Sequence, residues 1–126
     1  MPEKKIKPTE SEIEVLNILW EHGPQSVRFV NEKLNENREV GYTTSLKIMQ
    51  IMLEKGLLSR DASSRTHIYK AKVNEQKMQG QLLKKFVDSA FRGSSTNLVL
   101  QALGNLKPSQ EELDEIKELI KKIEKK

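Results

Sequence analysis

The side chains best suited to contact another molecule are concentrated between residues 43 and 72. This segment carries six basic residues against Glu54 and Asp61, which leaves it with a net charge of +4. Residues 1–42 carry a net charge of −2 and residues 73–126 a net charge of +2, so the basic excess is concentrated in one segment. Basic side chains gathered in this way suit a polyanion such as the phosphate backbone of nucleic acid.

Within this segment, polar side chains crowd the exposed start of a helix expected from Thr43 to Lys55. Gln can pair with adenine, Lys can donate to guanine, and a Thr methyl can contact a thymine methyl. A helix of this kind is expected to enter the major groove with its N-terminal half against the base edges. The predicted base-reading residues are Thr44, Ser45, Lys47 and Gln50. The predicted phosphate contacts are Arg28, Tyr42, Thr43, Ser63, Ser64 and Arg65; for each, the alternative is a polar side chain that only faces water.

Other kinds of site chemistry find little support. The chain has no cysteine, which excludes disulfides, a thiol nucleophile and cysteine-ligated metals, and it fits a reducing cytoplasm. There is no glycine-rich phosphate loop and no convincing Ser/His/Asp set. Glu10, Glu12 and Glu14 could suggest a metal site, but a solvated helix face is the favoured interpretation. We therefore predict a protein that is not an enzyme, with no metal and no cofactor.

The candidate residues need a scaffold, and the preceding segment predicts two helices. Thr9 and Glu12 form a capping-box pattern before a helical apolar face that includes Leu16 and Leu19, and Gly23-Pro24 ends this helix. Ser26 is the expected N-cap of a shorter helix on which Phe29 lies off the apolar stripe. Phe29 is therefore expected to pack on a neighbouring element or on a partner chain.

The third helix is expected to open at Tyr42-Thr43-Thr44, with Thr43 or its neighbour as N-cap, and to stop at Gly56. Its buried face is expected among Leu46, Met49, Ile51, Met52 and Leu53. Two strands, Leu57–Arg60 and Thr66–Lys70, follow around a polar turn. The fold class predicted is therefore mostly α, a winged helix-turn-helix in which three helices carry a β-hairpin wing.

The remainder of the chain predicts three further helices that are too short to build a core of their own. The first starts after Asn74, the second ends at Gly104, and the third opens with a capping box at Ser109 and Glu112. Their apolar stripes need a partner, which predicts a homodimer. The expected domains are 1–73 for DNA binding and 74–126 for helical dimerisation. The expected dimerisation residues are Leu82, Phe86, Leu98, Leu103, Leu113, Ile116 and Ile120.

Several stretches resemble the penicillinase-repressor family in their order and spacing. They are Thr-Glu-Ser-Glu-Ile-Glu-Val-Leu-Asn-Ile-Leu-Trp-Glu-His-Gly-Pro at 9–24, Ser-Val-Arg at 26–28, Tyr-Thr-Thr at 42–44, Leu-Glu-Lys-Gly-Leu-Leu at 53–58, Tyr69 and Ser-Ser-Thr-Asn-Leu-Val-Leu at 94–100. The resemblance implies a cytoplasmic winged-helix homodimer that binds an inverted-repeat operator of double-stranded DNA and blocks transcription.

In the antibiotic-responsive branch of that family, a membrane metalloprotease sensor signals induction and the repressor is cut at an Asn-Phe bond. The matching bond here is Gln101-Ala102, a departure from the family pattern. The copper-responsive branch uses a cysteine-rich site, which this chain lacks. Two other classes stay open on the residues alone: a winged-helix module that binds proteins, and a regulator that responds to a small molecule. The N-terminal segment carries no apolar signal region.

Overall fold

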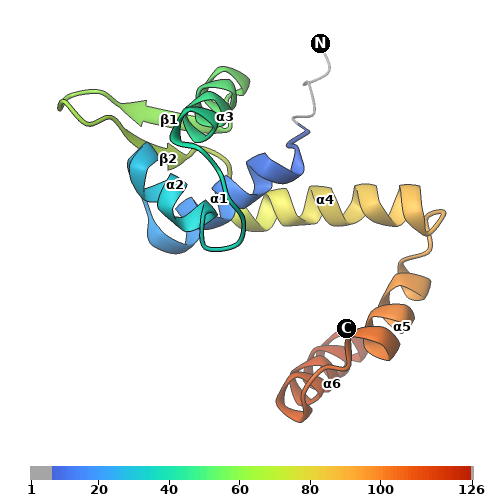
Figure 1. The fold of residues 1–126 in the computed structure, drawn as a ribbon. Helices are drawn as coiled ribbons and strands as arrows, with labels where there is room; N and C mark the ends of the chain where they lie inside the picture. Colours follow the sequence, from blue (N-terminus) through green and yellow to red (C-terminus); the bar gives the residue numbers. More distant parts are fainter. Residues whose placement is uncertain (1–6, 126) are drawn as a thin grey trace. The chain divides into compact units, whose positions relative to one another are not determined.

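The computed structural model describes residues 7–125, so the polar segment at residues 1–6 and Lys126 lie outside the described residues. The chain divides into two compact units, one up to Met78 and one from Gln79. Figure 1 labels the elements in chain order. Within the described residues, no helix is long and apolar enough to cross a membrane.

The first unit begins with two capped helices. α1 (Glu10–His22) follows the N-cap Thr9, whose hydroxyl accepts from the Glu12 amide, while the Glu12 carboxylate accepts from the Thr9 amide. This reciprocal pair is the predicted capping box, and it satisfies two amide donors that a helix start would otherwise leave unpaired. α2 (Val27–Leu34) follows Ser26, whose hydroxyl accepts from the Phe29 amide. Both predicted caps are confirmed.

The third helix, α3 (Tyr42–Lys55), begins without a side-chain cap. Its N-cap is Gly41, not Thr43 or its neighbour as predicted. The other end follows the prediction: Gly56 adopts φ +82° in the left-handed region, and the Leu57 amide donates to the Met52 carbonyl at 2.9 Å. A left-handed residue at this position favours glycine because it has no Cβ.

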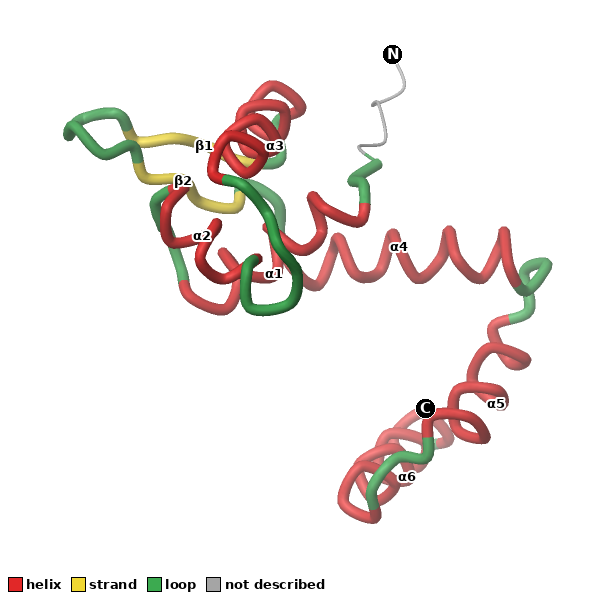
Figure 2. Tube along the Cα trace, in the orientation of Figure 1, coloured by secondary structure: helices red, strands yellow, loops and turns green. Residues whose placement is uncertain are grey.

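A two-stranded antiparallel hairpin follows α3. β1 (Leu58–Asp61) pairs with β2 (Ile68–Ala71) in the register that sets Leu58 opposite Ala71 and Asp61 opposite Ile68. Figure 2 shows the turn between the strands reaching away from the three helices. Each strand lies one or two residues later than predicted. The segment between α1 and α2 adds one further pairing, in which the backbone of Gln25 and that of Tyr69 exchange hydrogen bonds at 2.9 and 2.8 Å.

The core of the first unit lies between its helices and the base of the hairpin. Its side chains are apolar and nearly or fully buried: Val15, Leu16, Leu19, Val27, Val30, Leu34, Met49, Met52, Leu57, Leu58 and Tyr69. The prediction that Ile51 shares the buried face of α3 is wrong, because its side chain is 38% exposed. Ile51 precedes Met52 and so lies about 100° away from it around the helix.

Two aromatic side chains join elements within this unit. The Trp20 ring nitrogen donates to the Val73 carbonyl at 3.1 Å, which ties α1 to the segment before α4. The Phe29 ring lies edge-on to the His22 ring, with 5.2 Å between the ring centroids. Of the two expectations for Phe29, contact with a neighbouring element is the one that the structure shows.

The remaining helices are α4 (Glu75–Ala90), α5 (Ser95–Leu106) and α6 (Gln110–Glu124). α4 begins in the first unit and ends in the second. The predicted capping box at the start of α6 is confirmed, since the Ser109 hydroxyl accepts from the Glu112 amide and the Glu112 carboxylate accepts from the Ser109 amide. Neither α5 nor α6 has a buried residue.

Candidate nucleic-acid interface

The exposed face of α3 carries three of the four residues predicted to read bases. Thr44, Lys47 and Gln50 are all exposed, and their spacing of three residues places them along one side of the helix. Within residues 7–125, the Lys47 ammonium has no carboxylate partner at ion-pair distance. This face therefore offers a free cation, an amide and a hydroxyl to whatever approaches α3.

Ser45 does not belong to this face, and the expectation that it is exposed to read a base is wrong. Its side chain is fully buried, and its hydroxyl oxygen accepts a hydrogen bond from the Asn31 side-chain amide at 2.9 Å. A serine so placed cannot reach a base edge. The periodicity of α3 put Ser45 at the border of two faces, and the neighbouring helix α2 decides that it is covered.

The residues predicted to contact phosphates come from three different elements. Tyr42, 50% exposed, and Thr43 open α3, and Arg28 is exposed on α2. Arg65 is exposed in the turn of the wing, and neither Arg28 nor Arg65 has an ion-pair partner in the described part of the chain. Unpaired arginines at the surface are suited to bind phosphate oxygens.

The wing turn is organised by its own hydrogen bonds. The Ser63 amide donates to the Asp61 carboxylate at 2.9 Å, and the Ser64 hydroxyl donates to the Thr66 carbonyl at 2.7 Å. The backbone hydrogen bond from Ser63, reinforced by its hydroxyl, lowers the pKa of Asp61 because both donors stabilise the charged form. The Ser64 proton is used inside the turn, so in this structure its hydroxyl has no proton to donate to a phosphate.

The C-terminal end of α3 is held against α1 by an ion pair. The Lys55 ammonium lies 2.9 Å from both carboxylate oxygens of Glu12, whose side chain is only 5% exposed. The expectation that Glu12 belongs to a solvated face is therefore wrong, because α3 covers it. Among the described residues, no group of three or more His, Cys, Asp or Glu side chains could hold a metal ion.

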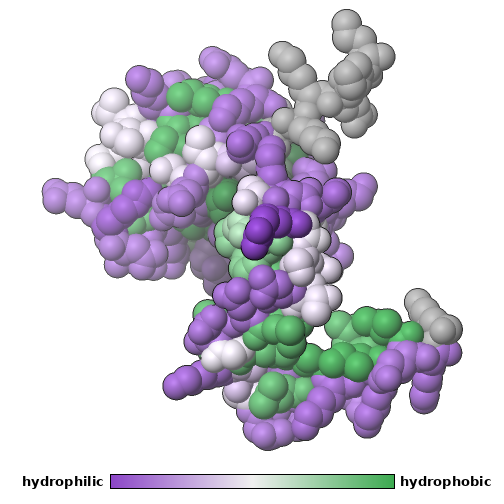
Figure 3. Space-filling view, turned by 90° about the vertical axis from the view of Figure 1, so that its right-hand side faces the viewer, coloured by the Kyte–Doolittle hydropathy of each residue, from purple (hydrophilic) through white to green (hydrophobic). Residues whose placement is uncertain are grey.

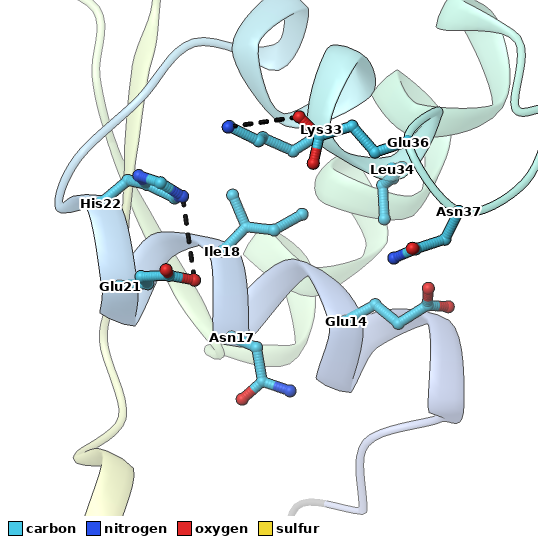
Figure 4. Close-up of a pocket in the computed structure, with 9 residues that line it drawn as sticks. All are labelled: Glu14, Asn17, Ile18, Glu21, His22, Lys33, Leu34, Glu36 and Asn37. Carbon is cyan, nitrogen blue, oxygen red and sulfur yellow. Dashed lines mark hydrogen bonds and ion pairs between the residues drawn. The ribbon is translucent and has the colours of Figure 1, made fainter.

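A groove of about 320 Å³ runs between α1 and α2 (Figure 4). Ile18 and Leu34 point into it, and charged side chains form its rim. Two ion pairs lie on this rim: Lys33 lies 3.3 Å from Glu36, and Glu14 accepts from Arg38 at 2.8 Å, while the His22 ring nitrogen lies 3.8 Å from the Glu21 carboxylate. The groove thus has no free cation comparable to Lys47, and nothing in it points to a bound ligand.

In the second unit, the predicted dimerisation residues are partly or fully exposed. Phe86 is 54% exposed and Ile120 49% exposed, and the others are half-buried: Leu82, Leu98, Leu103, Leu113 and Ile116. Figure 3 shows apolar side chains gathered into a patch over α5 and α6. The Gln101-Ala102 bond lies inside α5, and the Gln101 side chain donates to that of Asn97 at 3.2 Å. A protease could cut this bond only after local unwinding of the helix.

The sequence did not reveal how α3 is supported. Asn31 lies on a short amphipathic helix among exposed polar residues, and nothing in that pattern distinguishes it from a surface asparagine. The pairing of Gln25 with Tyr69 was also missed, because a single bridging residue leaves no alternating pattern.

Comparison with known proteins gives a consistent result. The model of the family described as "Penicillinase repressor" matches residues 8–122. A penicillinase repressor of Staphylococcus aureus is 22% identical over 126 residues, which cover all of both chains. The methicillin resistance regulatory protein MecI of Mammaliicoccus sciuri is 24% identical over 122 residues, or 97% of this chain and 99% of that protein. These relatives are a repressor and a regulatory protein, in agreement with the prediction that the chain is not an enzyme.

Two solved structures share the fold of the first unit. The solution structure of the DNA-binding domain of the repressor BlaI has a TM-score of 0.51 at 23% identity and covers 58% of this chain and 90% of that chain. The structure of the monomeric form of Bacillus licheniformis BlaI in complex with the blaP half-operator has a TM-score of 0.50 at 22% identity and covers 57% of this chain and 89% of that one. The predicted winged-helix fold is confirmed by these likenesses.

Proposed function

The chain belongs to the penicillinase repressor family, and from this membership we propose that it is a transcriptional repressor that binds double-stranded operator DNA. One observation carries the proposal: Thr44, Lys47 and Gln50 share the exposed face of α3, next to a wing whose Arg65 has no ion pair in the described chain. The BlaI structure with a half-operator supports the same use of the fold.

In the proposed complex, α3 enters the major groove. Lys47 donates to guanine, Gln50 pairs with adenine, and the Thr44 methyl group contacts thymine. Arg28 and Arg65, with Tyr42 and Thr43, bind phosphates on either side and hold the register. Phosphate contacts add affinity for any sequence, whereas the contacts made by α3 distinguish one sequence from another.

We further propose that two copies bind together on an inverted repeat. The second unit leaves a row of large apolar side chains exposed on α6, with Leu119 at 57%, Ile120 at 49% and Ile123 at 62%. Within the second unit, Val87 is the sole apolar side chain of the described residues that is buried. A second copy that covers this apolar surface would supply the burial that the single unit lacks.

The function is tested by selecting binding sites from a pool of random DNA duplexes and measuring affinity for the selected duplex by fluorescence anisotropy at several salt concentrations. The expected result is an inverted repeat bound with strong salt dependence. A second winged-helix role, as a module that binds proteins, would be favoured if no duplex bound in a salt-sensitive manner. That outcome would contradict the proposed repressor.

The dimer is tested separately by analytical ultracentrifugation. Ile120→Glu places a carboxylate in the proposed interface and is expected to shift the protein to the monomer, because an unpaired buried charge opposes association. Lys122→Glu is the matched control, since Lys122 is exposed and has no ion pair among residues 7–125. Equal association of the two variants would contradict the proposed interface.

A further inference from the structure

The turn between α2 and α3 is held by two asparagine side chains. The Asn31 side-chain nitrogen donates to the Val40 carbonyl and to the Ser45 hydroxyl oxygen, at 2.9 Å in each case. The Asn35 side-chain nitrogen donates to the same Val40 carbonyl at 2.8 Å, and the Val40 amide donates to the Asn35 side-chain oxygen at 3.1 Å. We call Asn31, Asn35, Val40 and Ser45 the asparagine clamp.

The clamp acts on the last residue before the N-cap of α3, whereas the earlier part of the turn is held by the Asn37 and Arg38 amides, which donate to the Leu34 carbonyl at 3.3 Å. The Val40 carbonyl accepts from Asn31 of α2 and from Asn35, the C-cap of α2, and the Val40 amide donates to Asn35. Gly41 has no side chain with which to cap α3, and no side-chain cap bond is present there. The start of α3 therefore takes its position relative to α2 from the clamp together with apolar packing.

Ser45 transmits this position into the helix itself. It is fully buried in the second turn of α3, directly after Thr44 and two residues before Lys47. A hydrogen bond from α2 to this residue restrains both the rotation of α3 about its axis and its sliding along α2. This restraint fixes the direction in which the exposed side chains of these helical turns point, because so short a length of helix moves as a rigid body.

Base reading depends on such restraint more than phosphate binding does. Hydrogen bonds to base edges are formed near 2.7–3.2 Å and weaken steeply when the angle is poor, so a small shift of the helix weakens them. Arginines and lysines on flexible stems can follow a phosphate over a similar shift. Loss of the clamp should therefore reduce the preference for the correct sequence and leave general DNA binding largely intact.

We propose that Asn31 is a positioning residue for DNA recognition, which acts through Ser45 and Val40 to aim the exposed face of α3. The proposal rests on the proposed operator binding by α3 and adds a residue that touches no DNA itself. It predicts that sequence specificity is encoded partly on α2, in a side chain that faces away from the operator.

The test compares the affinity of the full chain for the selected inverted-repeat duplex with its affinity for a scrambled duplex of equal length. Asn31→Ala removes both donated hydrogen bonds, and Asn31→Asp keeps the shape but replaces the donor with an acceptor that faces the Val40 carbonyl. Asn17→Ala is the matched control, since Asn17 is an exposed helical asparagine with no hydrogen bond from its side chain among the described residues. Measurements are made well below each variant's unfolding temperature.

The ratio of the two affinities is expected to fall about tenfold for Asn31→Ala, comparable to the loss of one base contact, and at least as much for Asn31→Asp. Asn17→Ala should keep the wild-type ratio. A purely structural role for Asn31 would reduce the folded fraction and lower both affinities by the same factor, so an unchanged ratio overturns the proposal. If Asn31→Ala does not fold, Ser45→Ala provides the test, because it removes only the hydrogen-bond acceptor inside α3. A severalfold fall in the ratio of the two affinities then supports the proposal, and an unchanged ratio overturns it.

The failure of the proposed function has a different signature. If the wild-type chain binds neither duplex in a salt-sensitive manner, operator binding is wrong and the recognition role of Asn31 is overturned with it. If the wild type discriminates between the duplexes and the Asn31 variants discriminate equally well, operator binding stands and only the positioning role is wrong.

Discussion

The ion pair between Glu12 and Lys55 makes a prediction about how α3 is secured. The Glu12 carboxylate is 95% removed from solvent, and the Lys55 ammonium contacts both of its oxygens at 2.9 Å. At this separation and an effective dielectric constant of about 20, the Coulomb attraction is about 6 kcal/mol. Most of it is offset by the cost of removing the charges from water, so a net contribution of about 2–3 kcal/mol is expected, as for other hydrogen bonds to charged groups.

Lys55→Met is the cleanest perturbation of this pair, because Met keeps an apolar stem of similar length and removes the ammonium. It leaves the Glu12 carboxylate with the Thr9 amide as its remaining hydrogen-bond donor among the described residues. The expected loss is about 2 kcal/mol in the free energy of unfolding of the first unit, or roughly 8–16 °C in its midpoint temperature. Urea unfolding can be followed by the fluorescence of Trp20, which is the sole tryptophan of the chain and lies in this unit.

Lys47→Ala is the control on the same helix, and it should show the opposite behaviour. Lys47 is exposed and unpaired in the described chain, so its loss should change the free energy of unfolding by less than about 0.5 kcal/mol. It should instead weaken operator binding by about 1–3 kcal/mol. Lys55→Met should leave the affinity of the folded protein within about twofold, because Glu12 already neutralises the Lys55 charge. Equal stability of Lys55→Met and the wild type would refute the argument that this pair secures α3.

Three further predictions concern the core, the wing and its turn. Leu16→Ala, at a side chain with no exposed surface, should cost about 2–5 kcal/mol in urea unfolding, and a smaller loss would mean that the site collapses around the cavity. Arg65→Ala should weaken binding to all duplexes alike and reduce the slope of log K against log salt by about 0.9; a loss confined to one sequence would contradict a phosphate contact. The Asp61 carboxyl, whose pKa is lowered by the Ser63 hydrogen bonds, should titrate in ¹³C NMR below the ordinary value of about 3.9. The Asp61 carboxylate stabilises the turn fully above its unfolded-state pKa, and this stabilisation is lost as the pH falls through its folded-state pKa. A titration midpoint of Asp61 at the ordinary value would show that these hydrogen bonds are not maintained in solution.

Much of the fold could be predicted because its signals are local. The capping boxes at Thr9 and Ser109 need only residues three positions apart, and the stop at Gly56 needs only one residue with the correct backbone freedom. Apolar periodicity then identifies the helices between these signals. The hairpin was placed within two residues because its turn residues are typical, although its strands are too short for periodicity to define their ends.

The candidate site could be predicted only in part, because helical periodicity says which residues share a face but not where a neighbouring element ends. Thr44, Lys47 and Gln50 lie well inside the exposed face of α3 and were placed correctly as exposed residues. Ser45 and Ile51 lie at its borders, and both were assigned to the wrong side. The DNA contacts of Thr44, Lys47 and Gln50 and the homodimer remain predictions that the proposed binding and association experiments test.

The sequence by itself determined the element order, the helix caps, the basic segment from residue 43 to 72 and, through its resemblance, the family. Each depends on residue types at short range or on matching patterns along the chain. Only the tertiary structure decided which polar residues support α3 and which face outward. Asn31 and Ser45 are 14 positions apart, and Glu12 and Lys55 are 43 positions apart. Hydrogen bonds across such separations form because packing brings the helices together. In the sequence alone, nothing distinguishes the side chains involved from ordinary exposed polar residues.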